Sequence, residues 1–430
     1  MKTIKLTTET KKDVLTTLLK RGVGQFPDHE RVVNEIINSI KVNGDSALFN
    51  YTKIFDKCDI NAENIRVTKE EIAAAYERVD PEFVAVMKRA AANIISFHEK
   101  QKRESWFETK PDGSILGQRI TPLDISGVYI PGGKAAYPAS VLMNVIPAKV
   151  AGVLRIVAVT PPDAKGNVYD GTLVACDIAG VNEIYKAGGA QAIAALAFGT
   201  ESIPKVDKVT GPGNMYVTLA KKACFGFVSI DSLAGPSEIL VLADEAANPR
   251  YIAADLLSQA EHDELASAIL VTTSSELAEK VSQEVDKFLD ELPRSDIMKA
   301  SLENYGYILL AKDMEEAIEL TNDIAAEHVE ILTKAPFEIM PKIRHAGALF
   351  LGEYSSEPLG DYFAGPNHII PTNGTARFFS PLSVEDFTKK SSIIAYSAAG
   401  LKEVHKDIEL FAEKEGLTAH ANAIRVRFER

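Results

Sequence analysis

The feature that most constrains this chain is a regular alternation of short β-rich runs and helical runs between residues 125 and 351. For example, the apolar run 155–159 precedes a helical pattern near 171–180, and the run 268–272 precedes one near 275–290. Such alternation is typical of a mostly parallel sheet whose faces are covered by helices. Because two such series occur, we predict an α/β protein with two Rossmann-like parallel-sheet units.

The ends of the chain lack this alternation. Apolar residues at helical spacing predict helices over 28–55 and 68–102, and 106–120 has the pattern of a hairpin. The last helices are expected around 399–414 and 419–428. We therefore divide the chain into an N-terminal helical segment (1–25), one α/β globule (26–126 plus 237–380), a second globule (127–236) and a C-terminal helical tail (381–430).

Length and composition exclude several classes of protein. The 430 residues exceed one ordinary domain, and 46% hydrophobic with 25% charged residues is a globular composition. A net charge of −13 argues against general binding to nucleic acid or anionic membranes. No run approaches the roughly 20 apolar residues of a membrane span. The three cysteines are too sparse for disulfides or a CxxC site, so we expect free thiols in a reducing cytoplasm.

Three glycine-rich turns each follow an expected strand and precede an expected helix. They are Pro131-Gly132-Gly133, Ala187-Gly188-Gly189-Ala190-Gln191 and Gly211-Pro212-Gly213-Asn214. Glycine lets backbone N–H groups approach a ligand, and a helix N-terminus favours anions. Together the turns favour a phosphate-bearing ligand, although each one is also compatible with an ordinary tight turn. No intact GxGxxG is present, because Tyr216 stands at the third glycine position.

The second α/β series carries polar side chains suited to metal binding and proton transfer. Gln259 and His262 are three residues apart, so they lie on one helical face and offer oxygen and nitrogen donors to zinc. Glu327 and His328 stand where a helix runs into a strand, and they offer two proton acceptors of different pKa. On spacing alone, solvated polar neighbours at the end of a helix explain Gln259 and His262 better than a metal site does, and a surface pair explains Glu327 and His328 better than a catalytic pair does.

Two further segments complete this set of polar residues. Asp361 stands in 360–368, which we expect to be a long loop, and its carboxylate is a possible metal ligand or the start of an Asx turn. Glu415 and His420 lie between the two C-terminal helices, where functional roles and simple capping are both open. Periodicity alone does not decide between these alternatives.

At these residues the sequence resembles the histidinol dehydrogenase family over nearly its whole length. The agreeing segments, in order, are Gly127-Val-Tyr-Ile-Pro-Gly-Gly, Gly188-Gly-Ala-Gln-Ala-Ile-Ala-Ala-Leu-Ala-Phe-Gly-Thr-Glu-Ser, Gly211-Pro-Gly-Asn, Ala234-Gly-Pro-Ser-Glu, Leu257-Ser-Gln-Ala-Glu-His, Ala326-Glu-His and Pro358-Leu-Gly-Asp-Tyr-Phe-Ala-Gly-Pro-Asn-His. Their joint order and spacing identify the resemblance, which implies an aldehyde-dehydrogenase-like pair of α/β units.

The resemblance implies a role for each matching position. It implies one Zn²⁺ per subunit in the 26–126 plus 237–380 globule, held by Gln259, His262, Asp361 and His420, beside a catalytic pair formed by Glu327 and His328. It implies NAD in the 127–236 globule. The implied NAD contacts are Tyr129, Gln191 and Asn214, and the implied substrate contacts are Ser237, Gln259, His262, His328, Asp361, Glu415 and His420. It also implies a homodimer in which the C-terminal segment is exchanged, so that Glu415 and His420 complete the partner's site.

The implied reaction is the four-electron, NAD-linked oxidation of L-histidinol through L-histidinaldehyde to L-histidine, the last steps of histidine biosynthesis. His328 is expected to remove the alcohol proton, and Glu327 is expected to activate water for the second oxidation. Three alternatives stay open on the residues alone: a zinc/NAD dehydrogenase of another small hydroxy compound, a zinc hydrolase, and a non-catalytic protein stabilised by a metal. Neither nucleic acid nor membrane is an expected partner.

Overall fold

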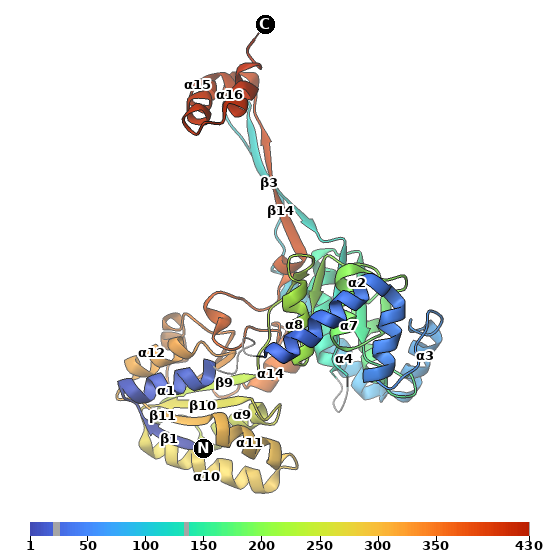
Figure 1. The fold of residues 1–430 in the computed structure, drawn as a ribbon. Helices are drawn as coiled ribbons and strands as arrows, with labels where there is room; N and C mark the ends of the chain where they lie inside the picture. Colours follow the sequence, from blue (N-terminus) through green and yellow to red (C-terminus); the bar gives the residue numbers. More distant parts are fainter. Residues whose placement is uncertain (20–25, 133–136, 430) are drawn as a thin grey trace. The chain divides into compact units, whose positions relative to one another are not determined.

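The computed structural model describes residues 1–19, 26–132 and 137–429 (Figure 1). The chain divides into two compact units. The first comprises Met1–Gln101 and Leu123–Phe387, and the second comprises Lys102–Pro122 and Thr388–Arg430. In the parts that are described, no helix combines the length and the apolar character needed to cross a membrane.

The first unit contains a six-stranded, fully parallel sheet in the order β1-β11-β10-β9-β12-β13. Alternate residues of its central strands enter two different cores, so helices cover both faces. Helices α9, α10 and α11 cover one face, and α1 and α12 cover the other. The bounds are β1 (Lys2–Lys5), α1 (Thr8–Leu19), β9 (Glu238–Ala243), α9 (Pro249–Ala260), β10 (Ser267–Thr272), α10 (Ser275–Glu291), α11 (Ser295–Tyr305), β11 (Gly306–Leu310), α12 (Met314–Ile324), β12 (His328–Leu332) and β13 (Ala348–Leu351).

The same unit contains a five-stranded parallel sheet in the order β6-β5-β4-β7-β8. Helices α2, α7 and α8 pack on one face, whereas α3, α4, α5 and α6 pack on the other. The bounds are α2 (Pro27–Phe55), α3 (Lys69–Arg78), α4 (Pro81–Glu99), β4 (Ile125–Tyr129), α5 (Pro138–Ala151), β5 (Arg155–Thr160), α6 (Asp170–Ala179), β6 (Glu183–Lys186), α7 (Gly189–Phe198), β7 (Lys208–Thr210), α8 (Met215–Cys224) and β8 (Ser229–Ile230). The prediction of an α/β protein with two Rossmann-like parallel-sheet units is confirmed.

The packing of the N-terminal helices differs from our expectation. We grouped residues 26–126 with 237–380, but α2, α3 and α4 bury their apolar faces on the five-stranded sheet. For example, Ile36 of α2 lies in one core with Val157 of β5, and Ile94 of α4 lies in another with Val128 of β4. An apolar helical face shows that a helix is buried, but it does not show against which sheet. Residues 1–25 are also not purely helical, because β1 pairs with β11.

The second unit is a three-stranded antiparallel sheet followed by two helices. Strands β2 (Trp106–Thr109), β3 (Ile115–Pro122) and β14 (Thr388–Ala395) lie in the order β14-β3-β2. The hairpin expected over 106–120 is thereby confirmed. The expected helical tail 381–430 is corrected, because it includes strand β14 before helices α15 (Ala398–Lys414) and α16 (Thr418–Arg425).

Candidate active site

The predicted catalytic pair lies at the amino end of the six-stranded sheet. Glu327 immediately precedes β12, and His328 is its first residue, opposite Ile239 of β9. Glu327 Oε2 accepts a hydrogen bond from the backbone N–H of Glu238 (2.9 Å), and His328 Nδ1 contacts the Glu238 carbonyl oxygen (3.0 Å). A single residue of β9 therefore orients both side chains, and the carbonyl requires the proton of His328 to be on Nδ1.

Burial and the charge of the neighbouring group strongly shift the pKa of both Glu327 and His328. Burial raises the pKa of the Glu327 carboxyl to about 8, although His328 acts to lower it. Burial alone would lower the pKa of His328, but the surrounding carboxylates Glu327 and Asp361 outweigh it and raise the value to about 10. His328 Nε2 is buried and makes no hydrogen bond, and it lies 3.8 Å from Asp361 Oδ1. Because carboxylates cause the rise in the pKa of His328, a cation bound beside Asp361 would oppose it and favour the neutral imidazole that can accept a proton.

Gln259 and His262 stand at the end of α9, as the spacing predicted. His262 Nδ1 contacts the Ser258 carbonyl oxygen at 3.0 Å, which leaves Nε2 available as a donor to a metal. Gln259 is 1% exposed, and its amide oxygen is buried without a hydrogen-bond partner. An orphaned buried oxygen is costly unless a ligand satisfies it, so this atom fits a cation site.

Asp361 joins this group from a short helix, not from the long loop that we expected. It lies in α14 (Glu357–Tyr362), a single helical stretch within an irregular segment. Burial would raise the pKa of Asp361, but the neighbouring His328 and His368 lower it to about 2. Ligand atoms of His262, Glu357 and Asp361 all lie within 4.8 Å of one another. Imidazole nitrogen, carboxylate oxygen and amide oxygen form a donor set that suits Zn²⁺.

Two residues of this group were not singled out by the sequence. Glu357 lies four residues before Asp361 on the same helical face, and Ser258 Oγ donates to its Oε2 (2.9 Å). His368 places Nδ1 3.0 Å from the Asp361 carbonyl oxygen and Nε2 3.3 Å from Ser140 Oγ. The four-residue spacing of Glu357 and Asp361 is a usable signal only once a helix is expected there.

The remaining predicted substrate residues lie in two places. Ser237 directly precedes β9, and its carbonyl accepts a hydrogen bond from the Ser267 N–H (3.0 Å). Glu415 and His420 belong to the second compact unit, Glu415 as the C-cap of α15 and His420 within α16, and both are exposed. Their part in the site stays a prediction.

A cavity of about 1060 Å³ opens at the carboxyl ends of β4, β5, β6 and β7, where parallel sheets bind ligands. The three predicted cofactor residues, Tyr129, Gln191 and Asn214, all line it. Gln191 is 1% exposed, and both polar atoms of its amide are buried without a hydrogen-bond partner. The Gly189 N–H donates to the Tyr129 hydroxyl (3.2 Å). Unsatisfied polar atoms on the wall of a large cavity fit a polar ligand such as a dinucleotide.

The glycine-rich turns at this cavity match their predicted positions where the structure describes them. The turn at Gly188 opens α7, and the turn at Gly211 leads into α8. The first turn is described only to Gly132, because Gly133 lies outside the described residues. A Cβ on Gly188 would lie 2.5 Å from Cβ of Pro161, so the close approach of the Gly188 turn to the residue that follows β5 requires glycine.

Comparisons with known proteins agree with these features. The model of the histidinol dehydrogenase family matches residues 19–428. A histidinol dehydrogenase of Halalkalibacterium halodurans is 58% identical over 412 residues, which cover 96% of this chain and 97% of that protein. One of Bacillus subtilis is 56% identical, with 96% of each chain covered. A crystal structure of histidinol dehydrogenase from Elizabethkingia anophelis has a TM-score of 0.94 at 40% identity, with 99% of this chain and 98% of that chain covered.

Proposed function

This chain belongs to the histidinol dehydrogenase family, and we propose on that basis that it oxidises L-histidinol through L-histidinaldehyde to L-histidine with NAD and one Zn²⁺ per subunit. The observation that carries the proposal is the cluster at the amino end of the six-stranded sheet. There the unpartnered Nε2 of His328 lies beside Asp361. The backbone of Glu238 holds the side chains of both Glu327 and His328. Gln259 offers a buried amide oxygen that has no hydrogen-bond partner. When bound, NAD supplies a hydride acceptor and Zn²⁺ supplies a Lewis acid.

The residues of this chain have separate tasks in the proposed site. Gln259, His262 and Asp361 would hold the metal, joined by His420 of the partner subunit, and Ser237 and Glu415 would contact the substrate. Tyr129, Gln191 and Asn214 would contact the dinucleotide in the cavity of the five-stranded sheet. This assignment gives each orphaned buried atom of Gln259 and Gln191 a ligand.

In the first oxidation, His328 Nε2 takes the hydroxyl proton of the alcohol while a hydride leaves the carbinol carbon. In the second, Glu327 takes a proton from water as the water oxygen adds to the aldehyde carbon, and His328 returns its proton to the aldehyde oxygen, which gives the hydrate. His328, neutral again, then takes a proton from one hydroxyl of the hydrate while a second hydride leaves, and the carboxylic acid that forms loses its proton to solvent. A positioned base contributes about 10²–10⁴-fold to such steps.

The cysteines support the route through water. Cys58, Cys176 and Cys224 are all buried, and burial raises the pKa of each thiol. A buried, protonated thiol is a poor nucleophile, so covalent attack by sulfur on the aldehyde is disfavoured. The proposal further includes a cytoplasmic homodimer with exchanged C-terminal segments.

The test is the formation of NADH from L-histidinol and from L-histidinaldehyde by the Glu327→Gln and His328→Asn variants. Because Glu327 acts only on water, Glu327→Gln should keep the first oxidation far better than the second. His328→Asn should slow both by about 10²–10⁴-fold. Glu338→Gln, an exposed position on α13 (Pro336–Ile339), is the matched control. Equal loss of both oxidations in Glu327→Gln, or no NADH from the wild-type protein, would contradict the proposal.

A further inference from the structure

The five-stranded sheet has the strand order of a dinucleotide-binding fold. Its first strand, β4, is central, with β5 and β6 on one side and β7 and β8 on the other. In such folds the ligand crosses the switch point beside the first strand. An acidic side chain further along the chain selects NAD by binding the ribose 2′-hydroxyl, whereas a nearby arginine accommodates the 2′-phosphate of NADP. The second strand, β5, ends at Thr160, and Asp163 follows three residues later on the wall of the cavity.

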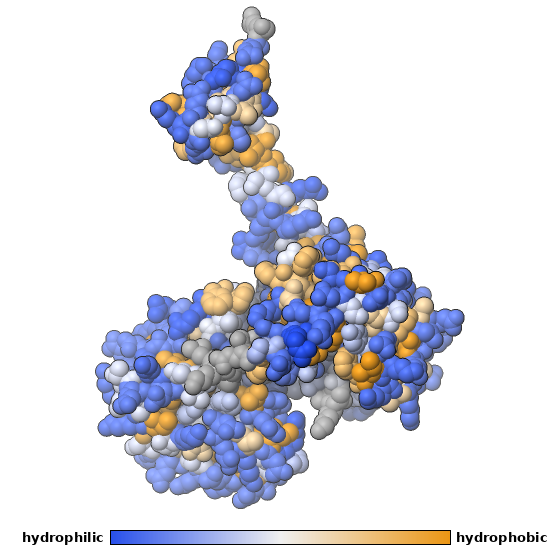
Figure 2. Space-filling view, in the orientation of Figure 1, coloured by the Kyte–Doolittle hydropathy of each residue, from blue (hydrophilic) through white to orange (hydrophobic). Residues whose placement is uncertain are grey.

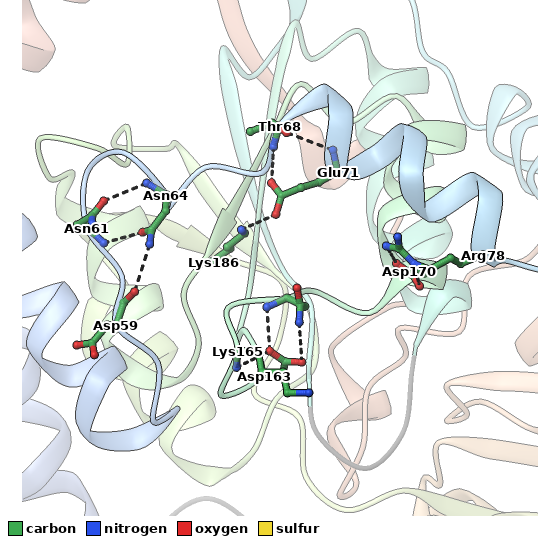
Figure 3. A network of polar contacts seen from close by, with 11 residues as sticks. Asp59, Asn61, Asn64, Thr68, Glu71, Arg78, Asp163, Lys165, Asp170 and Lys186 are labelled. Atoms are coloured by element: carbon green, nitrogen blue, oxygen red, sulfur yellow. Dashed lines mark hydrogen bonds and ion pairs between the residues drawn. The ribbon is translucent and has the colours of Figure 1, made fainter.

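The Asp163 carboxylate is held in place by its own loop, as Figure 3 shows. Its Oδ1 accepts hydrogen bonds from the backbone N–H groups of Lys165 and Asn167, both at 2.8 Å, and its Oδ2 accepts from the Asn167 side-chain amide (3.2 Å). Burial acts to raise the pKa of Asp163, but the bonds from Asn167 and Lys165 outweigh it and lower the value. The group is thus an oriented anion, and Oδ2 keeps room to accept a bond from a ligand hydroxyl.

The charges around this end of the cavity disfavour an additional phosphate. Among the described residues that line the cavity, Arg78 is the one cationic side chain. Its guanidinium is already committed to Asp170, with Nε–Oδ2 at 2.8 Å and Nη2–Oδ1 at 2.6 Å (Figure 3). Asp56 also lines the cavity, so three carboxylates face one paired guanidinium. Lys165, whose charge also lowers the pKa of Asp163, is not among the described residues that line the cavity. Of those lining residues, a phosphate here would meet three carboxylates and only a guanidinium that is already paired.

We propose that Asp163 is the residue that makes this site select NAD over NADP, because it accepts a hydrogen bond from the ribose 2′-hydroxyl and repels a phosphate in its place. This inference rests on the proposed function, in which the cavity holds the dinucleotide. The buried, unpartnered amide of Gln191 on the same wall is independent support for a polar ligand there.

The test compares NADH and NADPH binding to the full-length protein by isothermal titration calorimetry, for the wild type and for Asp163→Asn. Asparagine keeps an oxygen for the Lys165 and Asn167 N–H groups but removes the charge, so the loop is expected to stay in place. The wild type should bind NADH more tightly than NADPH, and Asp163→Asn should narrow the ratio of the two dissociation constants about tenfold. The ratio of kcat/KM for NAD and NADP should narrow in the same direction.

Asp59→Asn is the matched control. Asp59 is exposed, pairs with Lys53 and does not line the cavity, so its loss removes one charge from the same region without reaching the ligand. The ratio should not change in this variant. An unchanged ratio in Asp163→Asn with NADH binding intact, or an equal change in Asp59→Asn, would overturn the inference and leave the proposed function standing. A wild-type protein that binds neither coenzyme would overturn both.

Discussion

Asp56 carries a negative charge in a position that is unfavourable for two reasons. It is the C-cap of α2, where the helix dipole already places partial negative charge, and its carboxyl is partly buried with no hydrogen-bond partner for Oδ2. Burial raises the pKa of Asp56 to about 6 in the folded protein, above its value of about 3.9 in an unfolded chain. The folded state therefore binds the proton more tightly than the unfolded state does.

The sign of the resulting pH dependence follows from linkage. The stability contributed by the protonated carboxyl is complete below the unfolded pKa and is lost as the pH rises through about 6. Asp56→Asn should therefore stabilise the protein at pH 7.5 and leave it unchanged near pH 4. The gain should be about 1 kcal/mol or less, because solvent screens a partly exposed group. Thermal unfolding without ligand at both pH values measures this, and equal shifts at both would contradict the assignment.

The site residues differ in how far the sequence could predict them. Gln259 lies in the last turn of α9, and His262 follows two residues after the helix ends, where its N–H still donates to the Gln259 carbonyl oxygen (3.2 Å), so a three-residue spacing is enough to predict that the two residues are neighbours. Asp361 is about 100 residues further along, so only the fold brings it to His262. Glu357 was missed because no helix was expected around it. The family resemblance identified Asp361 as a site residue but did not explain how it reaches the site. The structure explains this, because Asp361 lies in α14 close to His262.

At the scale of elements, the turn between β7 and α8 is held by a buried ion pair. The Gly211 N–H donates to Asp231 Oδ2 (2.8 Å), and Lys221 Nζ donates to the Gly211 carbonyl oxygen (3.0 Å). Lys221 and Asp231 also pair with each other, and their side chains are 2% and 5% exposed. The Lys221–Asp231 pair thus fixes both the N–H and the carbonyl oxygen of Gly211, which stands three residues before Asn214.

We expect this pair to position the turn for the dinucleotide as well as to stabilise the fold. Lys221→Met leaves a buried, uncompensated Asp231 and should destabilise the protein by about 3–5 kcal/mol. The double variant Lys221→Met/Asp231→Leu removes both charges and should recover most of that stability. Its affinity for NADH should nevertheless stay reduced, because nothing then holds Gly211. Urea unfolding and calorimetric NADH titration separate the two effects, and wild-type affinity in the double variant would show that the pair has only a structural role.

Elements with strong apolar periodicity were predictable, whereas two exposed strands, β14 and β1, were not. The strands and helices of the two parallel sheets follow the predicted alternation because most of these strands are buried on both faces. Strand β14 was missed because it is largely exposed and includes Lys389 and Lys390, so it carries no apolar pattern. Strand β1 was missed for the same reason, since it is a short edge strand with one partly buried residue.

At the scale of the whole molecule, the second compact unit exposes an unusual amount of apolar surface. Large apolar side chains are exposed on it, among them Phe107 (61%), Ile394 (73%) and Phe411 (69%). Figure 2 shows hydrophobic surface over this unit. Such surface is typical of a protein–protein interface. The proposed exchange of C-terminal segments in a homodimer would cover it, and it would also carry His420 and Glu415 to the partner's site. No periodicity in the sequence could predict this arrangement.

The exchange can be tested by complementation between two defective chains. His328→Asn removes the base at the six-stranded sheet but leaves the C-terminal segment intact, whereas His420→Asn does the reverse. Each homodimer should be nearly inactive. If the segments are exchanged, a heterodimer of the two variants contains one site with both residues unchanged: His328 of the His420→Asn chain, and His420 of the partner subunit. This heterodimer should therefore have about half of the wild-type activity.

If each chain instead completes its own site, every site in that heterodimer carries one defect. Heterodimers purified through two different affinity tags should then be no more active than the homodimers, and this result would contradict the exchange. A heterodimer of wild type and His328→Asn controls for the tags, because it keeps one intact site under either arrangement. The comparison therefore depends on which chain supplies His420, not on how much each substitution slows the reaction.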